Sequence, residues 1–88
     1  MTLTWSPAYT PTFRKDYKNL SQQNQGRVDD AIRDILHADD PKRLGRPKLG
    51  KWQGVYGYDV GRAIRVLYTV ELRTRSVLFL RCGPHPIY

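Results

Sequence analysis

The sequence is poor in the residues that build cross-links and metal sites. Its 88 residues include one cysteine, Cys82, and two histidines, His37 and His85. A single cysteine excludes an internal disulfide framework and a cysteine-rich zinc site, and it suits a reducing compartment such as the cytoplasm. Neither histidine belongs to a C-x-x-C, H-x-x-x-H or carboxylate cluster, so we expect no metal site and no cofactor.

Long apolar runs are missing as well. No stretch approaches the roughly 18 to 20 apolar residues that a membrane-spanning helix needs. The N-terminal stretch MTLTWSPAYTP lacks the basic and apolar segments of a signal peptide. We therefore expect a cytoplasmic protein with no membrane partner, and the length predicts one domain over residues 1–88.

Acidic residues are scarce in the second half of the chain. Residues 1–40 carry five basic and six acidic side chains, a net charge of −1. Residues 41–88 carry ten basic side chains against Asp59 and Glu71, a net charge of +8. Positive charge concentrated in one half of a small protein favours a polyanionic partner over a generally soluble basic surface.

Familiar nucleophile and phosphate-loop motifs are absent too. The sequence contains no G-x-S-x-G, no P-loop and no G-x-G-x-x-G. Asp59 and Glu71 stand apart, so no carboxylate pair suggests hydrolysis of that kind. Cys82 has no histidine at a known motif spacing, which favours a small buried side chain over a reactive thiol.

The first half of the sequence predicts a strand and two helices. A short run over residues 2–5 has strand character, and Ser6-Pro7 ends it. Thr10 followed by Pro11 predicts the N-cap and first residue of a helix over about residues 11–20. Ser21 is a second predicted N-cap, before a helix over about residues 22–38. Its apolar stripe consists of Val28, Ala31, Ile32, Ile35 and Leu36.

The second half predicts a basic loop and three strands. Asp40-Pro41 ends the second helix, and residues 41–53 predict a loop rich in proline, glycine and basic residues. Strands over residues 54–60, 63–71 and 76–82 are joined by short turns and therefore form an antiparallel meander. The predicted order is β-α-α-β-β-β in an α+β fold, with the helical hairpin packed on one face of a sheet that the first strand also joins. The opposite, concave face would carry Arg65 and Arg81.

The remaining candidates are side chains that could catalyse a reaction without a metal ion. RNA can be cut by attack of its own 2′-hydroxyl on the adjacent phosphate, with no metal and no protein nucleophile. Histidine can move the protons, arginine can stabilise the phosphorane, and tyrosine can stack on a base. The candidate catalytic residues are Arg65, His85 and Tyr88, and the candidate RNA-binding residues are Arg46, Lys48, Lys51, Arg62 and Arg81.

Nearly the whole chain resembles the RelE/ParE superfamily of toxins from type II toxin–antitoxin systems, because its β-α-α-β-β-β order agrees as well. The resemblance is carried by the proline-ended second helix, the basic loop with its glycines, the strand GVYGYDV, the R-V-L-Y run at residues 65–68 and the C-terminal tyrosine. The resemblance implies a ribosome-dependent endoribonuclease that cuts mRNA, with a cognate antitoxin as its partner. By the same resemblance Arg65 stabilises the transition-state phosphate, Tyr88 packs on the nucleotide or aids proton transfer, and His85 is a general acid or base.

The resemblance leaves two alternatives and one role open. A ParE-like toxin has the same fold but acts on DNA gyrase through protein contacts, and an inactive toxin homologue would bind without cutting. On the strand before Arg65, where RelE-like toxins can carry lysines, this sequence has Tyr56, Tyr58 and Asp59. The resemblance therefore leaves the identity of the general base open.

Overall fold

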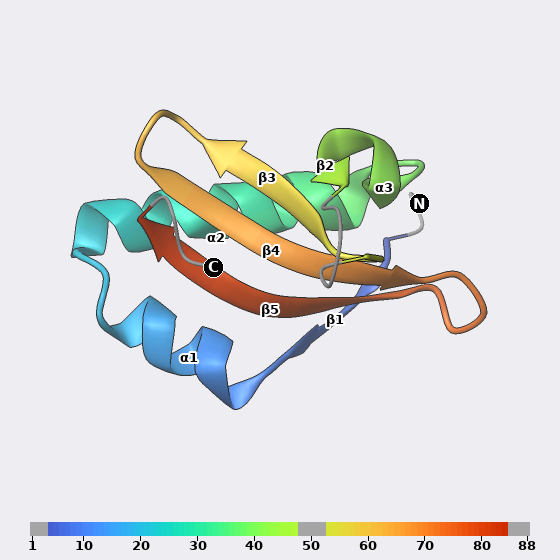
Figure 1. The fold of residues 1–88 in the computed structure, drawn as a ribbon, viewed down its shortest axis with the longest axis horizontal. Coiled ribbons are helices and arrows are strands. Elements are labelled where there is room, and N and C mark those ends of the chain that lie inside the picture. The colour runs from blue at the N-terminus through green and yellow to red at the C-terminus, as the bar shows by residue number, and fades with distance from the viewer. Residues whose placement is uncertain (1–3, 48–52, 85–88) are drawn as a thin grey trace.

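The computed structural model describes residues 4–47 and 53–84. Figure 1 shows a twisted sheet with helices behind and below it. The elements in chain order are β1 (Ser6–Tyr9), α1 (Pro11–Lys18), α2 (Gln22–His37), α3 (Pro41–Leu44), β2 (Arg46–Pro47), β3 (Tyr56–Val60), β4 (Ile64–Glu71) and β5 (Ser76–Pro84).

Both long helices begin where the capping residues predict. The Thr10 hydroxyl accepts a hydrogen bond from the Phe13 backbone N–H at 3.0 Å, and the Ser21 hydroxyl accepts one from Asn24 at 3.2 Å. The two helices form the predicted hairpin. Its arms are joined by the Gln25 side chain, which donates to the Tyr17 carbonyl at 2.8 Å, and by further contacts of Tyr17.

The predicted end of the first strand at Ser6-Pro7 is wrong, because the strand β1 begins at Ser6. Residues 4 and 5 of the predicted run are not in a strand, and residues 2 and 3 lie outside the described ranges. Pro7 does not end it, because β1 is an edge strand and a missing N–H on an edge costs no ladder hydrogen bond. Trp5 precedes the strand and is buried, with its indole N–H donating to the Ala38 carbonyl at 3.0 Å.

The segment predicted as a loop holds two short elements. The Asp40 carboxylate caps α3 by accepting from the Lys42 N–H at 3.1 Å, and Pro41 occupies the first turn, so Asp40-Pro41 starts a helix after α2 has already ended at His37. Gly45 then leads into β2. A Cβ at Gly45 would lie 2.6 Å from the Tyr68 hydroxyl, so glycine is required by this close approach.

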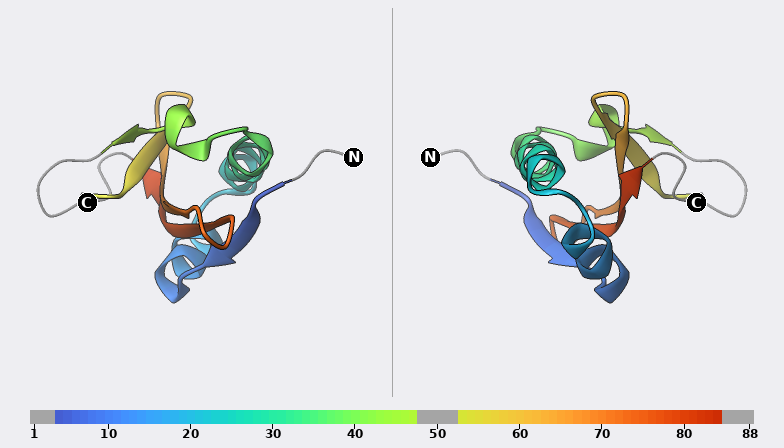
Figure 2. Two further views of the ribbon diagram at one scale, coloured as in Figure 1. Left: turned by 90° about the vertical axis from the view of Figure 1, so that its right-hand side faces the viewer. Right: turned by 90° about the vertical axis from the view of Figure 1, so that its left-hand side faces the viewer.

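The described strands form one five-stranded sheet in the order β1-β5-β4-β3-β2. Strands β3, β4 and β5 are antiparallel neighbours, as the predicted meander requires, and β1 joins β5 in parallel. Figure 2 shows α1 and α2 on the same side of the sheet. The predicted α+β architecture, with helices on one face, is confirmed.

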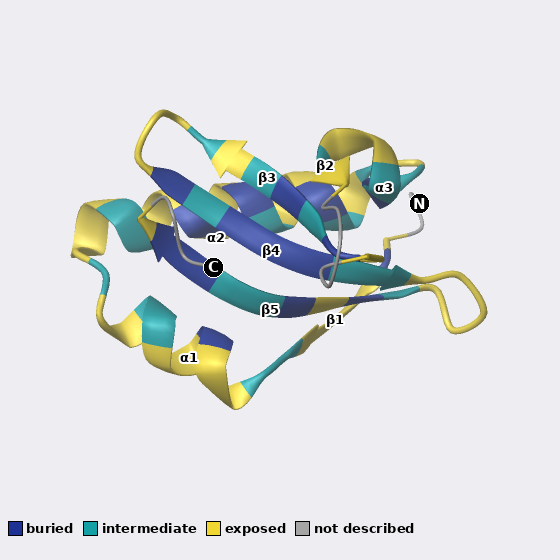
Figure 3. Cartoon of the chain, in the orientation of Figure 1, coloured by how far each residue is buried: buried dark blue, intermediate teal, exposed yellow. Residues whose placement is uncertain are grey.

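The core lies between that face and the two helices. It combines Phe13 of α1, Val28 and Ile35 of α2, and Val66 and Tyr68 of β4. Figure 3 shows burial concentrated along β4 and β5, while the turn between them is exposed. On β4, Ile64, Val66 and Tyr68 belong to this core, and Arg65 and Leu67 between them lie on the opposite face. Leu67 is nevertheless fully buried, so burial does not alternate strictly along the strand.

Candidate functional site

Arg46 and Arg65 lie on the face of the sheet that carries no helix among the described residues, and Arg81 lies at the β5 edge of that face. Residues directly opposed across antiparallel strands have side chains on the same face, so the strand register shows which residues lie together. We call this the helix-free face and define it by two cross-strand rows. The first row holds Arg46, Gly57, Leu67 and Arg81, and the second holds Asp59, Arg65 and Gly83.

Arg65 lies in the second row and is held by a carboxylate. Its Nε donates to Asp59 Oδ1 at 2.7 Å across the β3–β4 hairpin. The Arg65 side chain is 15% exposed, whereas that of Asp59 is 51% exposed. On the other side of Arg65 the row continues with Gly83, which has no side chain. The guanidinium is therefore oriented by a more exposed carboxylate beside it.

Arg81 is engaged by α1. Its Nε and Nη2 donate to the two oxygens of Asp16 at 3.0 and 3.1 Å, and Asp16 Oδ2 also accepts from the Cys82 backbone N–H at 3.3 Å. The hydrogen bonds to Asp16 raise the pKa of Arg81. A phosphate at Arg81 would have to compete with this bidentate pair, so the RNA-binding role of Arg81 stays a prediction.

The other predicted site residues fall into two groups. Arg46 on β2 and Arg62 in the β3–β4 turn are exposed, and both therefore remain available to a ligand. Four predicted site residues lie outside the described ranges: Lys48, Lys51, His85 and Tyr88. The structure thus brings Arg46 and Arg65 to one face, while the Arg81 side chain at the edge of that face turns to α1, and the grouping with His85 and Tyr88 stays a prediction.

Cys82 and Tyr68 have buried, unreactive settings. Burial raises the pKa of the Cys82 thiol to about 12, with the nearby Asp16 charge adding to the effect. The Tyr68 hydroxyl donates to the Pro41 carbonyl at 2.7 Å, and burial raises its pKa as well. Both residues therefore belong to the core, as the sequence predicts for Cys82.

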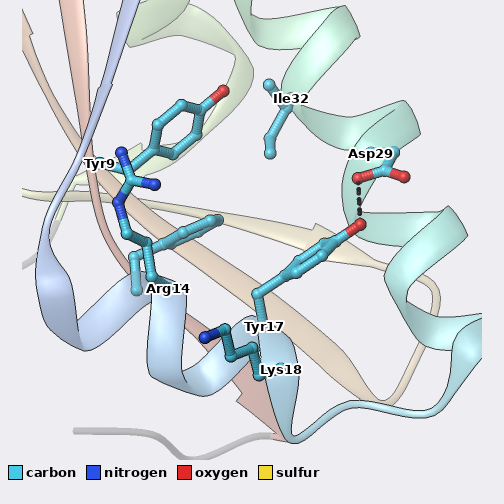
Figure 4. Close-up of a pocket in the computed structure, with 7 residues that line it drawn as sticks. Tyr9, Arg14, Tyr17, Lys18, Asp29 and Ile32 are labelled. Carbon is cyan, nitrogen blue, oxygen red and sulfur yellow. Dashed lines mark hydrogen bonds between the residues drawn. The ribbon is translucent and has the colours of Figure 1, made fainter.

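A hollow lies on the helix side, between β1, α1 and α2 (Figure 4). Its volume is about 370 Å³, and its lining combines aromatic and aliphatic side chains with charged ones at Arg14, Lys18 and Asp29. The Tyr17 hydroxyl donates to Asp29 at 2.8 Å, and this hydrogen bond raises the pKa of Tyr17. No sequence pattern indicated this hollow, because packing of separate elements creates it.

The described ranges show neither a metal site nor a membrane-spanning helix. Residues 4–47 and 53–84 contain no group of three histidine, cysteine or acidic side chains that could hold a metal ion. In the same part of the chain, no helix has the length and apolar character needed to cross a membrane.

A family model decides the membership of this chain. Residues 8–88 match the model described as ParE-like toxin of type II bacterial toxin–antitoxin system. The chain belongs to the ParE-like toxin family. The resemblance to the RelE/ParE superfamily seen in the sequence is thereby confirmed.

Solved structures show the same fold. The ParE-like toxin is similar to a chain of the RelBE2 toxin–antitoxin complex from Mycobacterium tuberculosis, at 22% identity and a TM-score of 0.74, over 93% of this chain and 99% of that one. It is similar to the YoeB/ParE toxin from Agrobacterium tumefaciens, at 20% identity and a TM-score of 0.76, over 91% of this chain and 98% of that one. It is also similar to a chain of the intact Escherichia coli RelBE complex, at 14% identity and a TM-score of 0.73, over 91% of this chain and 95% of that one. A comparison with curated protein sequences finds no match.

Two partners of the site arginines in this ParE-like toxin were missed from sequence. The sequence predicts that Asp59 stands apart from other functional groups, whereas it pairs with Arg65. Counting outward from the β3–β4 turn would have found it, because Asp59 and Arg65 are equally distant from Arg62. Asp16 lies 65 residues from Arg81, and no local signal relates the two.

Proposed function

We propose that this ParE-like toxin is an endoribonuclease that cuts mRNA on the ribosome and thereby inhibits translation. The observation that carries the proposal is the helix-free face, where Arg65 is oriented by Asp59 and the exposed Arg46 lies in the next row. Arginine suits phosphate recognition, since its planar fork donates to two oxygens at once.

The proposed reaction uses the 2′-hydroxyl of the RNA itself. The 2′-oxygen forms a bond to phosphorus, the bond from phosphorus to the 5′-oxygen breaks, and a 2′,3′-cyclic phosphate and a 5′-hydroxyl result. Arg65 would stabilise the negative charge on the phosphorane. Such electrostatic stabilisation is commonly the largest contribution to the rate enhancement. His85 is the proposed donor of a proton to the leaving 5′-oxygen, and Tyr88 would stack on the adjoining base.

The proposed off state is a complex with a cognate antitoxin. Two of the similar structures are toxin–antitoxin complexes, from Mycobacterium tuberculosis and Escherichia coli. The net charge of +7 favours an acidic segment as the inhibitor, and we propose that this segment covers the helix-free face and the basic residues beside it.

Induced expression in a bacterium tests the proposal. Wild type should arrest growth and produce new cuts inside translated codons of an abundant mRNA, read by primer extension. Arg65→Ala and a chain lacking residues 85–88 should each lose the cuts while they remain folded and soluble. Asp30→Ala is the matched control, because its pair with Arg33 is exposed on α2, away from the helix-free face.

Inhibition of DNA gyrase is the second candidate function. It is favoured by the carboxylates already paired with Arg65 and Arg81, since a protein contact needs no phosphate at either residue. Growth arrest without mRNA cuts, toxicity of the chain lacking residues 85–88, and loss of supercoiling activity by purified gyrase would together select this function over RNA cleavage.

A further inference from the structure

The carboxylate of Asp59 is unexpected at a phosphate site. It lies 2.7 Å from Arg65 Nε and is the more exposed of the two side chains, at 51% against 15%. A ligand that approaches Arg65 from the helix-free face would therefore meet Asp59 as well. An ionised carboxylate repels a phosphate, so a site that only bound phosphate would be better without it.

Other carboxylates are poorly placed for chemistry beside Arg65. Within residues 4–47 and 53–84, no other acidic side chain shares the row of Arg65. Asp16 is 15% exposed and accepts hydrogen bonds from Arg81 and from the Cys82 backbone. Glu71 is at the far end of β4, about 20 Å away by the rise of a strand, and accepts from the Arg73 N–H.

We propose that Asp59 is the general base of the RNA cleavage, an inference that rests on the proposed function. Its carboxylate takes the proton of the 2′-hydroxyl as the 2′-oxygen bonds to phosphorus. The electron pair of the breaking bond leaves with the 5′-oxygen, which gains a proton from the general acid. The proton count balances, because one proton enters the site at Asp59 and one leaves from the acid.

One guanidinium can place base and substrate together. A phosphate oxygen on a guanidinium lies about 2.7 to 2.9 Å from its nitrogen. Asp59 is within the same distance of Arg65 Nε, so a phosphate on this guanidinium would be the immediate neighbour of the carboxylate. The attacking 2′-hydroxyl is on the ribose joined to that phosphate, within the reach that general base catalysis requires.

Three arginines and one paired carboxylate lie on the described elements around Asp59. Arg65 approaches from β4, Arg62 lies in the following turn, and Arg46 of β2 is on the same face opposite Gly57. On β5 the row ends in Gly83, and the next row holds Arg81 with its partner Asp16. Asp59 accepts the hydrogen bond from Arg65 as a carboxylate, which is the form that can take up a proton.

The experiment measures single-turnover cleavage of mRNA bound to purified ribosomes. Asp59→Asn keeps an oxygen that can accept from Arg65 Nε but cannot take up the proton. It should slow cleavage by roughly 10²- to 10⁴-fold, while ribosome binding changes less than about threefold. The wild-type rate should fall on the acid side of the pH profile, and this limb should disappear in Asp59→Asn.

Asp59→Ala and Asp59→Glu complete the comparison. Alanine should be as slow as asparagine, and glutamate should recover part of the rate with an acid limb. Near-normal cleavage by Asp59→Asn with slow cleavage by Asp59→Ala would overturn the proposal, because Asp59 would then only position Arg65. An acid limb retained in Asp59→Asn would overturn it too.

Separate results test the role of Asp59 and the nuclease activity itself. If wild type cuts and Arg65→Ala does not, the nuclease stands, and the rate of Asp59→Asn alone decides the role of Asp59. If wild type makes no cut on programmed ribosomes, both proposals are wrong. Thermal unfolding of each variant against Asp30→Asn, an exposed residue on α2, excludes loss of the fold as the cause.

Discussion

At the scale of single residues, the buried polar atoms are matched with partners. Among the described residues, no buried side-chain nitrogen or oxygen lacks a hydrogen bond. The Tyr68 hydroxyl shows how this is achieved, because it reaches out of the core to the carbonyl of Pro41 at the start of α3. One side chain of β4 thus fixes the segment that leads into β2.

Removing that hydroxyl should weaken the fold. Tyr68→Phe leaves the buried Pro41 carbonyl without its donor, at a cost of about 1 to 3 kcal/mol in the free energy of unfolding. Tyr58→Phe is the control, since its hydroxyl makes a 3.4 Å contact with Asp34 at the surface and should change stability by less than about 0.5 kcal/mol. Equal urea midpoints for the two variants would contradict this role of Tyr68.

The Cys82 thiol predicts how stability changes at alkaline pH. Its pKa is raised from 9.0 to about 12 by burial, so the folded state keeps a proton that the unfolded state loses. This contribution is fully present below pH 9 and declines as the pH rises towards 12. Urea unfolding from pH 7.5 to 10.5 should show a smaller loss of stability in Cys82→Ala than in wild type. Parallel losses in the two proteins would refute the assignment.

At the scale of elements, sequence predicted what local signals define. The helices begin at Thr10 and Ser21 because capping chemistry is local, and β4 has the predicted faces because alternation is local. The first strand was misplaced because Pro7 resembles a strand end, and only the sheet order shows that it is an edge position. The rows of the helix-free face depend on register, which the composition of each strand leaves open.

The turn between α3 and β2 requires glycine. Gly45→Ala would place a Cβ 2.6 Å from the Tyr68 hydroxyl and 3.0 Å from the Gly57 carbonyl, so we expect a loss of about 1 to 3 kcal/mol. Gly26→Ala is the control within helix α2, where nothing lies within 4 Å, and it should stabilise by roughly 0.5 to 1 kcal/mol. Thermal melts with shifts of the same sign would contradict the close approach.

The pair between Arg81 and Asp16 attaches α1 to β5. Asp16→Ala removes the bidentate contact and the acceptor of the Cys82 N–H, so it should cost about 1 to 2 kcal/mol. Asp30→Ala breaks an exposed pair with Arg33 and should cost less than about 0.5 kcal/mol. Hydrogen exchange should show faster opening of α1 only in Asp16→Ala, and unchanged exchange there would refute this attachment.

At the scale of the whole molecule, charge is divided between the two halves of the chain. Residues 41–88 carry a net charge of +8 against −1 for residues 1–40, and strands β2 to β5 belong to this basic part of the chain. Ribosome binding should therefore weaken steeply with salt. Arg62→Ala should lower the slope of log K against log salt by about one, whereas Arg33→Ala on α2 should leave it unchanged. Equal slopes would contradict docking through the strand side.

The most direct test of the central claim is cleavage by purified toxin on ribosomes programmed with a 5′-labelled mRNA. Wild type should cut within the decoded codons and leave a 2′,3′-cyclic phosphate, while folded Arg65→Ala should cut at least 100-fold more slowly. Cleavage by Arg65→Ala at the wild-type rate, or intact mRNA with wild type, would contradict the account.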